Sequence, residues 1–258
     1  MKARRDEMLK EMGLTPVWRL RAQSSAAVEE EGKTQSGNDR SNDEGDALEV
    51  IQQRLTPSND RRASIMRMDW AELKASVAAC TACPLHAKRN KTVFGVGDEN
   101  ADWLFVGEGP GAEEDAQGEP FVGQAGKLLD NMLAAINLKR GHNTYIANVV
   151  KCRPPGNRNP EPGEALACEP YLHRQIELIQ PKLIVALGKV AAVRLLAREA
   201  TVASLRGKVH EYRGIPLIVT YHPAYLLRSL HDKAKAWADL CYAVETMRGL
   251  QSGKSATI

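Results

Sequence analysis

The sequence contains no apolar run that approaches the ~18 residues needed to cross a bilayer. Its basic start, Met1 to Arg5, is not followed by the apolar core of a signal peptide. It also lacks internal repeats. These absences argue against membrane and repeat architectures, and we expect a cytoplasmic protein with no membrane contact.

Excess charge of one sign is also lacking, because the net charge is only +3 over 258 residues. Residues 66–258 hold 24 basic and 20 acidic side chains, so this part of the chain is mildly basic. Such a balance permits nucleic-acid binding without demonstrating it.

Cysteine is scarce, with five in the chain, and in a cytoplasmic protein they argue against a disulfide framework. Cys80 and Cys83 form a C-x2-C pair, and Cys152 and Cys168 are separated by fifteen residues. Four thiolates can hold zinc or an iron–sulfur cluster. The wide second spacing suits a zinc ribbon poorly and a four-iron cluster better. Unliganded core cysteines are the alternative, and for Cys241, in the apolar pattern of the last helix, that alternative is preferred.

The first 65 residues differ from the rest in composition. Residues 1–22 predict a short amphipathic segment, either a docking peptide for a protein partner or a frayed tail. Residues 23–62 are rich in polar residues and predict a disordered linker. Ordered structure is expected from about Asp69, where Asp69 and Glu72 fit a capping box. We therefore expect an N-terminal extension over 1–65, a folded domain over 66–250 and a tail over 251–258.

Strands alternate with helices through the folded part, which is typical of an α/β protein. The fold expected is an open, mostly parallel sheet of four strands with helices on both faces, a three-layer α/β/α arrangement. Strong strand signals are the apolar runs Trp103–Val106, Thr144–Lys151 and Leu183–Gly188.

Polar and aromatic residues follow several of these strands. Glu108 lies in the glycine-rich turn after the first, Asn148 near the end of the second, and His222 after a later strand. Phe121 lies in a loop nearby. Each alone has an ordinary structural interpretation, but strand ends of an open parallel sheet converge on one crevice. An aromatic ring, an amide, an imidazole and a carboxylate together suit a flat, polar heterocycle.

At these positions the chain resembles family 4 uracil-DNA glycosylases, over roughly residues 69–250. The resemblance rests on the order and spacing of the four cysteines and on four motifs: GEGPG at 107–111, PFVG at 120–123, NVVKCRPP at 148–155 and HPAYLLR at 222–228. It implies a glycosylase-like fold and hydrolysis of the N-glycosidic bond of deoxyuridine in single- or double-stranded DNA, by a monomer.

The resemblance also implies roles for individual residues. Phe121 would stack on uracil, Asn148 would read its N3–H and O4, and Glu114 would crowd out a thymine methyl group. Gly109 and His222 would stabilise charge on O2. Glu108 would orient the attacking water or stabilise the sugar cation.

Two further features follow from the resemblance. Leu226 or Leu227 would fill the gap left in DNA, with Arg228 on a phosphate. Cys80, Cys83, Cys152 and Cys168 would ligate a structural [4Fe–4S] cluster. The sequence KRGH at 139–142 is too short to be the basic loop of a related subgroup that traps uracil-DNA covalently, so we expect ordinary turnover.

Two other classes of protein fit the sequence less well. A non-enzymatic iron–sulfur module would be expected to lack the set formed by Glu108, Asn148 and His222. A nucleotide-binding enzyme would place Lys, Ser or Thr in the glycine turn, where this chain has Glu108, which repels phosphate.

Overall fold

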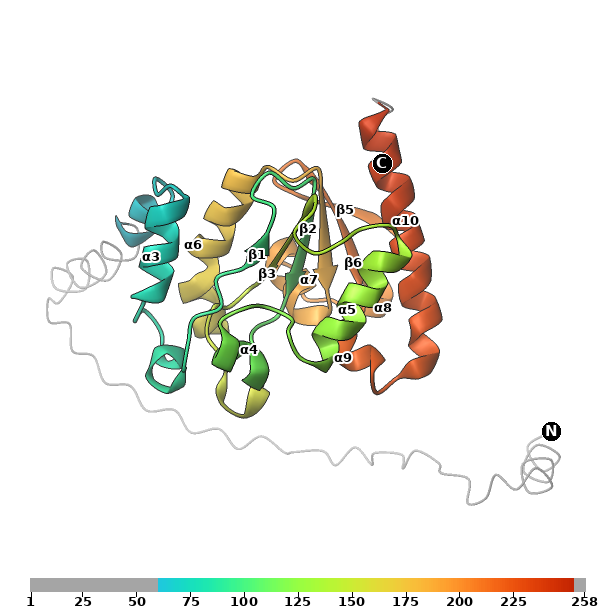
Figure 1. The fold of residues 1–258 in the computed structure, drawn as a ribbon. Coiled ribbons are helices and arrows are strands. Elements are labelled where there is room, and N and C mark those ends of the chain that lie inside the picture. The colour runs from blue at the N-terminus through green and yellow to red at the C-terminus, as the bar shows by residue number, and fades with distance from the viewer. Residues whose placement is uncertain (1–59, 253–258) are drawn as a thin grey trace, which may run out of the picture. The chain divides into compact units, whose positions relative to one another are not determined.

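A sheet of six strands forms the centre of the computed structural model, which describes residues 60–252 (Figure 1). The strand order is β1-β3-β2-β4-β6-β5. The four inner strands are parallel, whereas β1 pairs with β3 and β5 pairs with β6 in antiparallel fashion. The strands are β1 (Val96–Gly97), β2 (Trp103–Gly107), β3 (Thr144–Asn148), β4 (Leu183–Leu187), β5 (Val209–Tyr212) and β6 (Ile215–Thr220).

The α/β class is confirmed, but the expected number of four strands is wrong. The expected number covers only the parallel centre, although the sequence also predicts short strands at Val93–Val96 and Lys208–Tyr212, close to the edge strands β1 and β5. Both edge strands are short and less buried than the inner ones, so their apolar signal in the sequence is weak. The sheet is therefore mixed, with a parallel centre.

Helices cover both faces of this sheet. They are α3 (Trp70–Ala78), α4 (Ala112–Gln117), α5 (Gln124–Ala135), α6 (Pro162–Ile179), α7 (Lys189–Leu196), α8 (Val202–Leu205), α9 (Pro223–Leu226) and α10 (Lys233–Gln251), with 3-10 turns at Pro84–Lys88, Pro155–Asn157 and Leu230–Asp232. Side chains of α3, α6, α7 and α8 pack on one face of the sheet, and side chains of α5 and α10 pack on the other.

Strand β2 shows how the two layers form. All five of its residues are buried, and alternate side chains enter opposite cores. Leu104 and Val106 join the core under α6, while Trp103 and Phe105 join the core under α5 and α10. Because successive side chains enter two different buried cores, the sequence of β2 is apolar throughout rather than alternating.

The N-terminal side of the described region differs from expectation. The capping box is confirmed, because the Asp69 side chain accepts from the Glu72 N–H and the Glu72 side chain accepts from the Asp69 N–H. The start of ordered structure near Asp69 is wrong, since residues 60–65 are helical and Ile65 is 2% exposed in the core. The expectations for residues 1–22, for most of the 23–62 linker and for the end of the tail fall outside the described residues.

Within residues 60–252, no helix combines the length and the apolar character that crossing a membrane requires.

Candidate active site

The carboxyl ends of the parallel strands bring the predicted site residues together. Gly107, at the end of β2, is in register with Asn148, at the end of β3, so Glu108 follows directly beside Asn148. His222 comes two residues after β6. A cavity of about 410 Å³ lies at this edge of the sheet. Seven of the predicted residues line it: Glu108, Gly109, Glu114, Phe121, Asn148, His222 and Arg228.

The turn that carries Glu108 is fixed by the neighbouring strand. After β3 ends, the Val149 and Val150 N–H groups donate to the Gly107 and Glu108 carbonyl oxygens, at 3.0 and 3.2 Å. These bonds continue the parallel pairing beyond the strands and hold the backbone of Glu108.

The Glu108 carboxyl group is partly buried, and this burial raises its pKa above the ordinary value. No side-chain hydrogen bond or ion pair involving this carboxylate is found within residues 60–252. A raised pKa in a cavity is typical of a group that acts on a ligand rather than one that stabilises the fold.

His222 is neutral at pH 7, because burial lowers its pKa to about 4. Its Nδ1 accepts a hydrogen bond of 3.1 Å from the Ala224 N–H in the first turn of α9. An accepting Nδ1 carries no proton, so the ring proton lies on Nε2. The contact with Ala224 therefore sets the tautomer and makes Nε2 a hydrogen-bond donor.

Asn148 is 2% exposed, and its Oδ1 accepts no hydrogen bond from the described part of the chain. A buried acceptor without a partner costs about 1–3 kcal/mol, so such an atom in a cavity indicates a ligand donor. The backbone of Asn148 is held from behind, because the buried Lys151 Nζ donates to its carbonyl oxygen at 2.9 Å. Lys151 also donates to Gln175 Oε1 at 2.6 Å.

Phe121 forms the wall beside Asn148. Its ring is stacked against His222, with 5.5 Å between centroids and 30° between planes. A Cβ added at Gly107 would lie 2.6 Å from Phe121 Cζ and 2.5 Å from Asn148 Oδ1, so glycine at 107 leaves room for both side chains. Phe121 has a φ of +55°, a left-handed conformation that costs a non-glycine residue energy unless its surroundings impose it.

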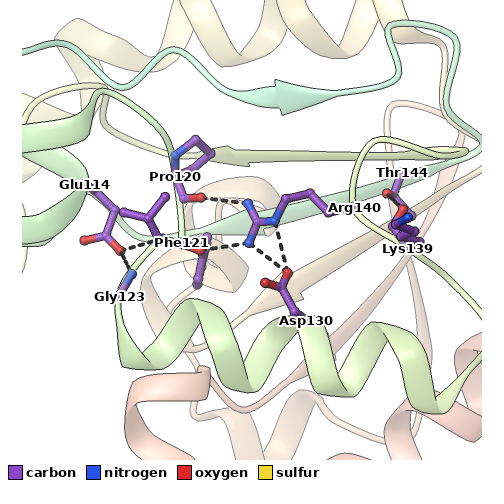
Figure 2. Close-up of polar contacts among 9 residues, drawn as sticks. Glu114, Pro120, Phe121, Gly123, Asp130, Lys139, Arg140 and Thr144 are labelled. Atoms are coloured by element: carbon purple, nitrogen blue, oxygen red, sulfur yellow. Dashed lines mark hydrogen bonds and ion pairs between the residues drawn. The ribbon is translucent and has the colours of Figure 1, made fainter.

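Glu114 lies in the first turn of α4 and joins two loops of the site. Its Oε2 accepts from the Gly111 N–H at 3.0 Å, and its Oε1 accepts from the Val122 and Gly123 N–H groups at 3.0 and 3.1 Å. Figure 2 shows part of this connection. The geometry therefore gives Glu114 a structural task in addition to the steric role expected for it.

The loop after His222 contributes one exposed leucine rather than two candidates. Leu226 is 1% exposed and packs with Met132, Ala236 and Leu240, whereas the DNA contact predicted for it requires an accessible side chain. Leu227 is 42% exposed, and Arg228 faces the cavity. The difference follows from helical geometry, because consecutive positions point about 100° apart, so Leu226 can face the core while Leu227, at the C-cap, faces solvent.

Sequence reasoning missed another wall of the cavity. It consists of residues in the loop after β3: Pro154, Asn157, Arg158 and Asn159. The Arg158 guanidinium donates to both carboxylate oxygens of Glu164, at 2.8 and 2.7 Å, and so ties this loop to the start of α6. The turn-forming PPGNRNP sequence predicted a loop, but nothing in its composition placed that loop over the site.

The four predicted cysteines line a second cavity, between α3, the loop after β3 and α6. Within residues 60–252, no three His, Cys, Asp or Glu side chains surround a single metal-ion position. Donors nevertheless point at the sulfur atoms. Arg89 Nη1 lies 3.2 Å from Cys152 Sγ, and the Lys151 N–H lies 3.3 Å from Cys168 Sγ. Four cysteine thiolates that accept hydrogen bonds match the ligand chemistry of an iron–sulfur cluster. Cys241 does not line this cavity.

Comparison with known proteins agrees with this geometry. The sequence pattern of the Uracil DNA glycosylase superfamily matches residues 94–241. The chain is 46% identical over 164 residues to the type-4 uracil-DNA glycosylase of Archaeoglobus fulgidus, covering 60% of this chain and 82% of that protein. It is 46% identical over 161 residues to the type-4 enzyme of Thermotoga maritima, covering 62% and 83%. A type-5 uracil-DNA glycosylase of Pyrobaculum aerophilum is 32% identical over 148 residues, covering 50% and 64%. The chain therefore belongs to the uracil-DNA glycosylase superfamily and, within it, to the type-4 uracil-DNA glycosylases.

Proposed function

We propose that this protein is a DNA repair glycosylase that hydrolyses the N-glycosidic bond of deoxyuridine, releasing uracil and leaving an abasic site. The observation that carries the proposal is the buried Asn148 Oδ1, which has no partner among residues 60–252 and lies beside the Phe121 ring. The target base must leave the duplex to reach a pocket of this kind, so the nucleotide is flipped out of the stack.

Asn148 reads the base in this proposal. Its Oδ1 accepts from uracil N3–H, and its amide nitrogen donates to O4. Cytosine presents an acceptor at N3 and an amine at C4, so the same amide mismatches both positions. Phe121 stacks on the base, a contact that contributes roughly 1–3 kcal/mol.

His222 and Glu108 act on the bond that breaks. Departure of uracil leaves negative charge near O2, where the neutral His222 donates through Nε2 and the Gly109 N–H is a second donor. Glu108, once ionised, orients water or stabilises the cationic sugar. Both roles of Glu108 require its deprotonated carboxylate, so excision slows as the pH falls through the raised pKa of Glu108.

An oligonucleotide assay tests this function. The purified protein is incubated with a strand that contains one uracil, and abasic sites are then cleaved with alkali. We expect cleavage at the uracil and none in an otherwise identical strand with thymine. Intact uracil strands after incubation with folded, iron-loaded protein would contradict the proposal.

We propose further that Cys80, Cys83, Cys152 and Cys168 hold a [4Fe–4S] cluster. When bound, the cluster supplies structural cross-linking and no redox step in the reaction. Its place between α3, the loop after β3 and α6 supports this role, because these segments are distant in sequence. The Cys152–Cys168 loop includes Asn157 and Arg158, which line the candidate active site.

Replacing Cys152 by serine is expected to remove most of the iron, which should otherwise be about four atoms per chain. Cys241→Ser is the matched control and should retain the iron, since Cys241 lies apart from the other cysteines. Iron content and absorbance are measured after anaerobic purification. Stoichiometric zinc without iron in the unaltered protein would reject the cluster.

The glycosylase domain is proposed to begin before the expected boundary at residue 66. Arg61 Nη1 donates to the Ala167 carbonyl at 2.9 Å, and its Nη2 lies 3.7 Å from Cys80 Sγ. A boundary at 66 would remove these contacts with the cysteine site. We propose that the substrate is single- or double-stranded DNA and that the protein works as a monomer. The protein partner expected for residues 1–22 would bind a segment that lies outside the described residues.

A further inference from the structure

The loop at residues 139–142 has no part in the function proposed above, although Arg140 reaches the candidate active site from it. The Arg140 Nη1 and Nη2 groups donate to the carbonyl oxygens of Pro120 and Phe121, at 2.9 and 2.8 Å. Figure 2 shows the guanidinium between these carbonyls and Asp130 of α5. Arg140 is thus bonded to the backbone of the residue whose ring forms the pocket wall.

Asp130 fixes the orientation of this guanidinium. Its Oδ1 accepts from Arg140 Nε at 3.0 Å and lies 2.9 Å from Nη2. The base of the loop is also anchored, because the buried Thr144 hydroxyl donates to the Lys139 carbonyl at 2.7 Å. All three nitrogen atoms of the planar Arg140 guanidinium group therefore donate hydrogen bonds, to Asp130, Pro120 and Phe121.

Three contacts impose the left-handed conformation of Phe121. Arg140 holds the Pro120 and Phe121 carbonyls, while Glu114 holds the following N–H groups of Val122 and Gly123. At Gly126, in the first turn of α5, a Cβ would overlap the Phe121 carbonyl. The segment is held from both sides, and its carbonyl side depends on Arg140.

We propose that Arg140 is a positioning residue for Phe121. It holds the Phe121 ring against His222, at the wall of the cavity on which the uracil base is proposed to stack. This proposal rests on the proposed function, because it assigns Phe121 to the uracil pocket. Arg140 itself touches neither the base nor the reacting bond. Two carbonyl oxygens need two donors held in fixed directions, which the planar guanidinium group of arginine provides and the single ammonium group of lysine does not.

Nuclear magnetic resonance of the histidine rings tests the position directly and does not depend on activity. The chain has six histidines, and the His222 signal is assigned by its loss in His222→Ala. Because the Phe121 ring is stacked on His222 in the unaltered protein, it should shift this signal, and Phe121→Ala should remove the shift. We expect Arg140→Ala and Arg140→Lys to move the His222 signal toward its Phe121→Ala position. A His222 signal unchanged in both folded variants would overturn the proposal.

Kinetics give the second readout. Arg140→Ala and Arg140→Lys are expected to slow single-turnover excision by about 10-fold, with DNA affinity nearly unchanged. In a Phe121→Ala background the same changes should have less than about a 2-fold effect, because paired residues are not additive. Rescue by lysine, or a full effect in the Phe121→Ala background, would instead indicate a contact of charge with DNA and would reject positioning.

Two more variants supply a control and an alternative to Arg140→Ala. Lys139→Ala removes an exposed charge from the same loop and should leave the His222 signal in place. Asp130→Asn weakens the support of the fork and should produce a smaller shift in the direction of Arg140→Ala, which keeps the proposal testable if Arg140→Ala does not fold. Failure of the proposed function would show as an inactive unaltered protein, whereas the His222 signal would still report the position of Phe121.

Discussion

Replacing His222 by alanine is expected to slow uracil excision by about 10²- to 10³-fold, the usual effect of removing one donor to developing negative charge. The expected loss lies in the chemical step, because the Nε2–H faces charge that grows as the bond breaks. Single-turnover rates at saturating protein measure it. Binding of the uracil strand should change little by comparison.

His142→Ala is the matched control, since His142 is exposed in the KRGH loop and should leave the rate unchanged. The pH profile adds a second criterion. With a pKa of about 4, His222 stays neutral through the ordinary range of histidine titration, so no loss of rate near pH 6.5 should be traceable to it. A rate of His222→Ala within about 5-fold of the unaltered protein would contradict the donor role.

Replacing Asn148 by aspartate is expected to lower uracil excision and to reduce the discrimination against cytosine. Loss of a bidentate base contact is worth roughly 1–3 kcal/mol, or about 5- to 150-fold. The new oxygen can accept from the exocyclic amine of cytosine, whereas the Asn148 NH2 group, which faces that position, can only donate. A carboxylate beside Glu108 also raises the cost of ionising both groups.

Matched duplexes with uracil or cytosine at one position measure this change. Asn100→Asp introduces the same chemical change at an exposed turn before β2, at the opposite edge of the sheet, and should leave both rates unaffected. His222→Ala should not admit cytosine, because O2 is common to both bases. Unaltered uracil rate and selectivity in Asn148→Asp would place base recognition elsewhere.

The parallel centre of the fold was predictable because its strands are buried on both faces. Leu183–Leu187 is apolar at every position, and such a run closed by glycine has few other interpretations. The bounds of the edge strand β1 were harder to predict, because β1 has only two residues and they are only partly buried. Residues 60–65 were harder still, since they are mostly polar and become ordered through long-range contacts such as that of Arg61 with Ala167.

The site shows the same division. Glu108, Asn148 and His222 could be placed together because parallel strands end at one edge of the sheet. The burial of Leu226 could not be predicted, because it depends on how α9 packs against α5 and α10. The second task of Glu114 and the role inferred for Arg140 depend on bonds to backbone groups, which leave no mark in the identity of the residues they bind.

Lys151 stands between the two cavities of the molecule. Its backbone N–H points at Cys168 Sγ, while its ammonium group bonds the carbonyl of Asn148. One residue therefore connects a thiol of the cysteine site with the backbone of Asn148, whose side-chain amide is proposed to read uracil. Displacement of Cys168 would reach Asn148 through a single side chain, without passing through the sheet.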